Sequence, residues 1–187
     1  MIYPSVVSST LSCQVYPSEY AYRDDSVSKA ESTNANCRRY PLPYASYVHC
    51  DGRQLKLADS DLGQEQYRSS DYYMWSAGSD GQLLFIFPTR VSLTTITLHY
   101  YSDSVRGRPR LTFYDVPDDF DVWNASIIGK PHVNVAMSPP GGQQAGRRSV
   151  SIIINFNTKK VLIYKFSNNF QFAVSEVEFS TMSCSGK

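Results

Sequence analysis

The sequence predicts an all-β domain, an antiparallel β-sandwich of the jelly-roll type, on three observations. Residues with β-branched or aromatic side chains number 58, against 33 for the strong helix formers Ala, Leu, Glu and Lys. Short apolar or alternating segments are separated by turn residues, and no helical pattern alternates with them. A length of 187 residues fits one domain. A helical bundle and a doubly wound α/β enzyme are therefore disfavoured.

The N-terminal part has the weakest pattern. Residues 1–50 are predicted to be an irregular segment of the same domain, tethered by disulfides, and residues 51–187 to form the sandwich. The first 40 residues are polar and serine-rich and lack sustained periodicity. We expect a short strand over residues 44–49 and one helical turn over residues 62–66.

Three strands are predicted in the middle of the chain. Residues 83–87 form an apolar run ended by Pro88, which is typical of a buried strand. Residues 91–101 alternate between apolar and polar side chains, which predicts a strand with one buried and one solvated face. Residues 110–114 form the third strand. We expect these three strands to make a meander.

The C-terminal part predicts a hairpin and a closing strand. Residues 150–156 and 161–166 are interpreted as its two strands, joined by a turn over residues 157–160. The final strand changes phase, because Phe170, Phe172 and Val174 share one parity whereas Val177 and Phe179 share the other. A β-bulge near Ser175 and Glu176 is therefore expected.

The four cysteines, Cys13, Cys37, Cys50 and Cys184, permit three pairings, and the sequence alone does not select one. The spacing favours a nested arrangement in which Cys13 pairs with Cys184 and Cys37 with Cys50. Disulfides and the single glycosylation sequon at Asn124 both agree with a secreted, extracellular or cell-surface glycoprotein.

Charge and hydropathy exclude several partners. The formal net charge of +1 creates no global field that would recruit nucleic acid or an anionic membrane. No apolar stretch approaches the roughly 18 residues of a membrane-spanning segment. We therefore expect neither nucleic-acid binding nor a membrane span.

The order of features resembles the discoidin, or coagulation-factor C-type, family within the galactose-binding-like jelly rolls. The resemblance covers roughly residues 70–184 and rests on Trp75 followed by two strands, on residues 111–114 followed by acidic residues and Trp123, and on residues 172–179 followed by Cys184. Residues 13–70 depart from the family's opening pattern, and Cys37 and Cys50 are additional. The laminin N-terminal domain and the ephrin-receptor ligand-binding domain are relatives by fold.

This resemblance implies a non-enzymatic module that binds glycans, lipids or proteins through loops at one end of a sandwich. The predicted meander adds a geometric step, because the segment before residue 82 and the loop 102–109 would emerge at the same end. The predicted ligand-binding rim is Tyr72, Tyr73, Trp75, Arg106, Arg108 and Arg110. Aromatic faces and guanidinium groups are common at recognition surfaces. The alternative is core packing for the rings and ordinary solvated loops for the arginines.

The aspartates and the histidines suggest two further kinds of site, for a metal ion and for catalysis. Asp59 and Asp61, or alternatively Asp118, Asp119 and Asp121, could supply oxygen ligands for calcium, although capping of backbone amides explains both clusters equally well. The three histidines, at positions 49, 99 and 132, sit in no catalytic motif, and the chain is expected not to be an enzyme.

The sequence therefore predicts an extracellular recognition or adhesion module, part of a receptor or adhesion protein, that binds a protein or glycan partner. One alternative is a calcium-dependent lectin. Another is a structural or assembly module of a larger surface protein, for which a homo-oligomer is expected.

Overall fold

Ten strands, and no helix, make up the part of the chain that the computed structural model describes. That part comprises residues 13–24, 37–41, 46–51, 57–68, 72–75, 78, 80–103, 106, 110–120, 132–136, 145–166 and 171–182. The strands are β1 (Cys13–Val15), β2 (Glu19–Asp24), β3 (Cys37–Pro41), β4 (Ser46–Asp51), β5 (Tyr73–Trp75), β6 (Gly81–Ser102), β7 (Arg110–Val116), β8 (His132–Ala136), β9 (Gly146–Lys165) and β10 (Phe172–Thr181). The all-β class and the antiparallel pairing are as predicted.

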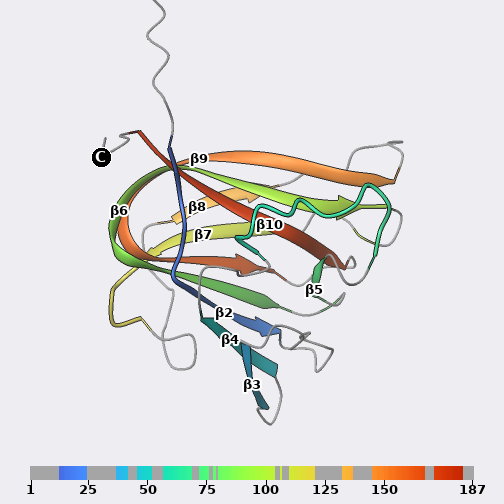
Figure 1. The fold of residues 1–187 in the computed structure, drawn as a ribbon, viewed down its shortest axis with the longest axis horizontal. Helices are drawn as coiled ribbons and strands as arrows, with labels where there is room; N and C mark the ends of the chain where they lie inside the picture. The colour runs from blue at the N-terminus through green and yellow to red at the C-terminus, as the bar shows by residue number, and fades with distance from the viewer. Residues whose placement is uncertain are drawn as a thin grey trace, which may run out of the picture.

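Two long strands, β6 and β9, build both layers of the sandwich. They pair with each other from Gly81↔Lys165 to Ser102↔Gly146, and the register shifts between Ile86 and Val91. At this point both strands turn over at one end of the molecule, so that two layers face each other (Figure 1). We call this end the bend; the opposite end, where both strands begin and finish, is the tip.

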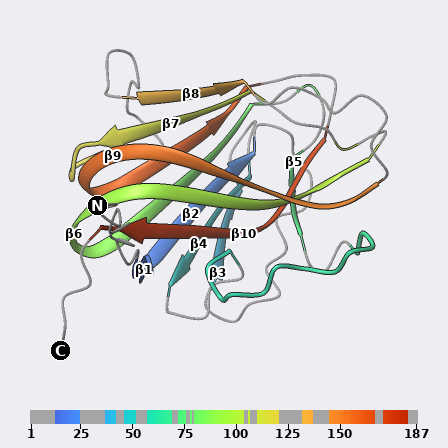
Figure 2. The same cartoon turned by 90° about the horizontal axis from the view of Figure 1, so that it is seen from above.

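The first layer has the strand order β3-β4-β2-β6-β9-β7-β8, and it uses the start of β6 and the end of β9. The second layer uses the other halves of these strands and adds β10 beside β6. The far side of β10 pairs with β1 near one end and with β5 near the other. Figure 2 shows the two layers from above, with β7 and β8 at the margin of the first layer.

The predicted hairpin and meander are wrong. Residues 150–156 and 161–166 belong to one strand, β9, and residues 157–160 carry it around the bend. Residues 83–87 and 91–101 likewise belong to β6, because Pro88 falls at the register shift, where an amide donor is not needed for pairing. A bent strand places its two ends together, as a hairpin would.

The irregular segment predicted over residues 1–50 contains strands β1 to β3 and most of β4, and β2 pairs directly with β6. The polar composition of this segment gave no alternating pattern from which these strands could be predicted. The strand expected over residues 44–49 corresponds to β4, displaced by two residues. The helical turn expected over residues 62–66 is not formed. The bulge is confirmed, since the register of β10 shifts between Val174 and Glu176.

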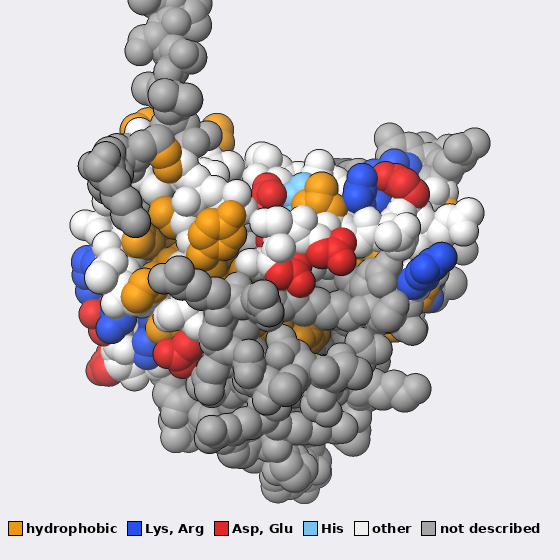
Figure 3. Space-filling model, in the orientation of Figure 1, with side chains coloured by type: hydrophobic (Ala, Val, Ile, Leu, Met, Phe, Trp, Pro, Cys, Tyr) orange, Lys and Arg blue, Asp and Glu red, His pale blue; other side chains and the backbone are white. Residues whose placement is uncertain are grey.

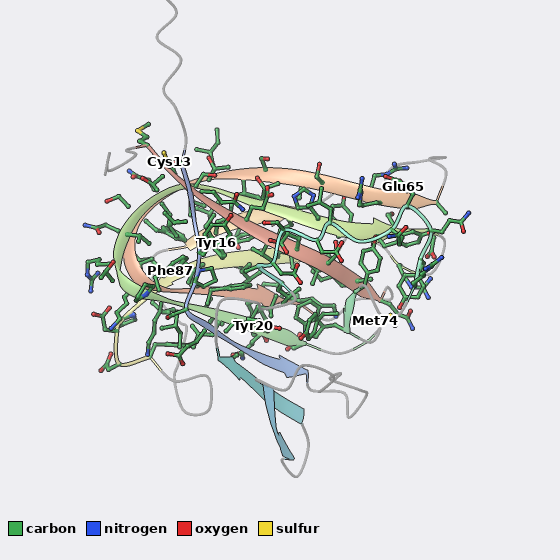
Figure 4. All side chains as sticks on the ribbon, viewed as in Figure 1. Cys13, Tyr16, Tyr20, Glu65, Met74 and Phe87 are labelled. Atoms are coloured by element: carbon green, nitrogen blue, oxygen red, sulfur yellow. The ribbon has the colours of Figure 1, made fainter. Side chains whose placement is uncertain are left out.

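Aromatic side chains fill the space between the layers. The Trp75 indole stacks on Phe172, with ring centroids 5.5 Å apart, and Phe179 meets the rings of Phe85 and Phe87 edge-on. Figure 4 places Phe87 at the bend, and Glu65 and Met74 toward the tip. The core therefore extends from one end of the sandwich to the other.

The two ends of the described chain lie side by side, because Cys13 pairs with Thr181. Cys13 is disulfide-bonded. Cys37 lies directly opposite Cys50 across β3 and β4, and antiparallel neighbours have Cα separations that a disulfide can span. Cys184, Trp123, Asn124, Arg108 and Asp121 lie outside the described residues.

We predict that peptide mapping without reduction recovers Cys37 linked to Cys50 and Cys13 linked to Cys184. The first pair is adjacent by register, and the second would tie β1 to the end of β10. A peptide linking Cys13 to Cys37 or Cys50 would contradict this arrangement.

Gly81→Ala should destabilise the fold by about 1–3 kcal/mol, the usual cost of overpacking. A β-carbon at Gly81 would clash with Cδ1 and Nε1 of Trp75, which is itself held against Phe172. Gly146→Ala is the matched control, because its β-carbon would meet nothing closer than 3.8 Å. Urea unfolding of the two variants should differ; equal midpoints would show that Trp75 can move away.

Candidate functional site

The tip brings together segments that are far apart in the sequence. The ends of β6 and β9 meet here, and β5, β7 and β10 also begin or finish beside them. The short turn after β6 closes through Asp103, whose amide donates to the Arg106 carbonyl at 2.8 Å, and an isolated bridge joins Arg106 to Gln171. The turn is thereby fixed to the start of β10.

Three tyrosine rings pack together at this end. Tyr67 stacks on Tyr72, with centroids 5.6 Å apart, and both rings contact Tyr101. Tyr72 and Tyr101 are buried, whereas Tyr67 is half-buried and caps the group. Tyr67 is the ring of this cluster that is placed to meet solvent.

The Arg106 guanidinium lies over the Tyr67 ring, 3.6 Å from its centroid. Its Nη1 also pairs with the Asp103 carboxylate, which accepts the Arg106 amide as well. This geometry holds the guanidinium over the ring. Cation–π contacts of this kind are attractive, and the Arg106 side chain is 20% exposed.

Two other arginines, Arg147 and Arg110, also lie at the tip. Arg147 donates to the Gly63 carbonyl at 2.9 Å and pairs with Glu65 at 2.9 Å. Arg110 is exposed, and its guanidinium lies 5.1 Å from the centroid of Phe166. No carboxylate among the described residues pairs with Arg110. Figure 3 shows Lys and Arg side chains at the right-hand end, which is the tip in this view.

The predicted rim is only partly realised. Tyr72, Tyr73 and Trp75 do lie at the tip, but their side chains are buried, because β5 pairs with β10 and faces the core. Instead of forming an exposed rim, these rings support it. Arg110, the first residue of β7, is exposed, and the Arg106 side chain is 20% exposed.

Tyr67, Arg147 and Glu65 were missed by sequence reasoning. Tyr67 lies in a stretch without periodicity, and nothing local marks it as the partner of an arginine 39 positions away. The adjacency arises because residues 57–68, which we call the strap, run along β10 toward the tip (Figures 1 and 2). Arg147 and Arg148 reach the tip because β9 begins there.

The strap is bound to β10 at the bulge. The Leu57 carbonyl accepts the amide of Val177 at 2.9 Å, and the Ser175 hydroxyl donates to the Leu62 carbonyl at 2.8 Å. Glu176 accepts the amides of Asp59 and Ser60, at 3.2 and 3.3 Å. The strap thus fills the stretch of β10 between its pairings with β1 and β5.

Glu176 is a buried carboxyl group, and burial raises its pKa to about 8. The neighbouring charge of Asp59 raises the pKa further, and the amide of Ser60 lowers it. The carboxyl that anchors the strap is therefore largely protonated at neutral pH.

The predicted calcium ligands serve the strap as amide acceptors. Asp59 accepts the amide of Asp61 at 2.9 Å, and Asp61 accepts that of Gly63 at 3.0 Å. At the bend, the exposed Asp118 pairs with Arg90 at 2.8 Å. Within the described ranges, no three His, Cys, Asp or Glu side chains are grouped so that they could hold a metal ion. Calcium binding stays a prediction from sequence.

Comparison with known proteins finds no matching family model and no matching curated protein. Among solved structures, the chain is similar to a Streptococcus pneumoniae fucose-binding module (TM-score 0.45, 15% identity, 78% of this chain and 92% of that chain). It is also similar to the lectin-binding domain of lectinolysin complexed with Lewis b (0.47, 9%, 71% and 84%). A third is the family 32 carbohydrate-binding module of C. perfringens NanJ with galactose (0.43, 8%, 67% and 82%).

At these scores, the fold assignment rests on the strand pairing described above. The resemblance to the discoidin family stays a prediction. No helix in the described ranges has the length and apolarity needed to cross a membrane.

Glu176 makes the stability of the fold depend on pH. The folded chain holds this proton up to about pH 8, whereas an ordinary glutamate releases it near 4.5, so the folded state binds more protons between these values. The free energy of unfolding should therefore fall as pH rises through this window, by at most about 1.4 kcal/mol per pH unit. Below the window this stabilisation is fully present.

Glu176→Gln should flatten this fall, measured by urea unfolding at several pH values. Asp119→Asn is the control, because that carboxyl is exposed and does not act on Glu176, and it should keep the fall. A Glu176→Gln variant with an unchanged pH profile would contradict the assignment.

Proposed function

We propose that the chain is a non-enzymatic extracellular recognition module that binds a glycan or protein partner at the tip of the sandwich. The observation that carries the proposal is the guanidinium of Arg106 held 3.6 Å over the half-buried ring of Tyr67. A fixed aromatic and arginine pair gives a ligand a preorganised planar hydrogen-bond donor beside an aromatic ring, with little conformational entropy left to lose.

The scaffold supports this reading. The residues of the tip stand on strand ends of a packed sandwich, and the arginine geometry is fixed by Asp103 and Glu65 before any ligand arrives. Binding groups mounted on a rigid scaffold are the usual arrangement in recognition modules. The exposed Arg110, which begins β7 at the tip, favours a partner that offers carboxylate, sulfate or other acceptor groups.

The proposed extracellular location is supported by the disulfide at Cys13. Disulfides are typical of oxidising compartments and rare in the cytosol. The non-enzymatic character is supported by the chemistry of the tip, which offers cations and rings rather than a nucleophile beside a base.

The test compares Tyr67→Ala and Arg110→Ala with Arg90→Ala on a glycan array and on intact cells with and without glycosidase treatment. Arg90 is the matched control, since it is an exposed arginine at the bend. Each tip variant should weaken binding at least tenfold, a loss of about 1.4 kcal/mol, and Arg90→Ala should bind normally.

Thermal unfolding of each variant must show an intact fold before its binding is compared. Sensitivity of cell binding to glycosidase distinguishes a glycan from a protein partner. Binding that is unchanged in both tip variants, or equally weakened by Arg90→Ala, would rule out the tip as the binding site.

A further inference from the structure

The second layer ends in an edge strand of unusual length. Residues 149–153, 156 and 157 of β9 pair with β6 on one side, and no other described strand pairs with the stretch 149–157. The other strands at the margins are short: β1 and β5 have three residues each, and β3 and β8 have five. This edge is therefore the longest row of backbone donors and acceptors that the described sheet leaves open.

Edge strands are normally protected against pairing by charges, proline, bulges or short length. β3 has such protection, since it contains Arg38, Arg39 and Pro41. Residues 149–157 of β9 contain no charged residue, no proline and no glycine. In the orientation of Figures 1 and 3, β9 lies along the upper margin, and the space-filling surface there is mostly white between the two ends. The edge thus lacks charge and proline, and the register shift opposite Leu93 and Thr95, between residues 153 and 156, is the irregularity that this stretch contains.

The side chains of this strand alternate regularly. The inner row, Ile152, Ile154 and Phe156 together with the half-buried Val150, packs against the core. The outer row is exposed: Ser149, Ser151, Ile153, Asn155 and Asn157. Ile153, at its centre, is 84% exposed, which is exceptional for a large apolar side chain in a strand of this molecule.

We propose that this edge pairs with the same edge of a second copy of the chain, antiparallel and centred on Ile153. In that register Ile153 lies opposite its own copy, and Ser151 lies opposite Asn155 of the other chain. Ser149 then faces Asn157. Directly opposite side chains on one face lie close enough to contact, so apolar meets apolar and hydroxyl meets amide throughout.

The occupant is a second copy because the row is self-complementary. A shift of one residue would put the outer row of one copy on the same face as the inner apolar row of the other copy. A shift of two would place Ile153 opposite a polar residue. The two-fold pairing also brings Val150 opposite Phe156 of the other chain, so that the apolar layer continues across the contact. The net charge of +1 leaves little repulsion between copies. A two-fold contact closes on itself and yields a dimer.

The test is sedimentation velocity of the full chain from about 1 to 200 μM. We expect a monomer–dimer equilibrium that Ile153→Lys shifts at least tenfold toward monomer, because paired lysines would face each other at the centre. Met182→Lys is the matched control: Met182 is 70% exposed and lies outside this edge. Both positions are exposed, so both variants should fold, which circular dichroism verifies.

Cross-linking tests the register independently. Under mild oxidation Ile153→Cys should form a covalent dimer, whereas Ser151→Cys should do so only when mixed with Asn155→Cys. A strictly monomeric chain at 200 μM, a dimer that Ile153→Lys leaves intact, or larger open-ended assemblies would overturn the proposal. These outcomes are independent of ligand binding at the tip.

Discussion

The pairing of β6 with β9 runs the length of the sandwich and around its bend, and the other strands attach to this ribbon directly or through neighbours. Because both strands turn over together, the apolar side of each half faces the other half, and one continuous sheet encloses its own core. The bend also determines where the ends of the strands fall. Gly81, Ser102, Gly146 and Lys165 meet at the tip for this reason.

The tip combines a buried aromatic base with a fixed, partly exposed aromatic and arginine pair. Buried rings of Tyr72, Trp75 and Tyr101 provide the base, and the side chains of Tyr67 and Arg106 form its exposed part. The strap couples this surface to the sheet through the bulge of β10, where Glu176 accepts two amides. The proton held by Glu176 removes a charge that burial would otherwise penalise. The proposed binding surface and the stability of the strap therefore depend on the same strand.

The tip and the β9 edge could act together without sharing a residue that either proposal tests. In the two proposals, the tip meets a partner through cations and rings, whereas the edge offers an uncharged strand to a second copy. Two copies joined along one layer would present two tips, and multivalent display raises apparent affinity for repeated ligands without any new contact. Weak single-site recognition is compatible with such an arrangement.

The sequence alone determined the all-β class, the strand over residues 110–114 and the bulge near Glu176. These follow from local propensity, alternation and phase, which are properties of neighbouring residues. Only the tertiary structure decided that residues 83–101 and 150–166 are two bent strands, that Trp75 is buried, and that Tyr67 lies under Arg106. A bend and a hairpin have the same local pattern, and the pairing of the strap with β10 depends on the free energy of the whole packed sheet rather than on any single segment.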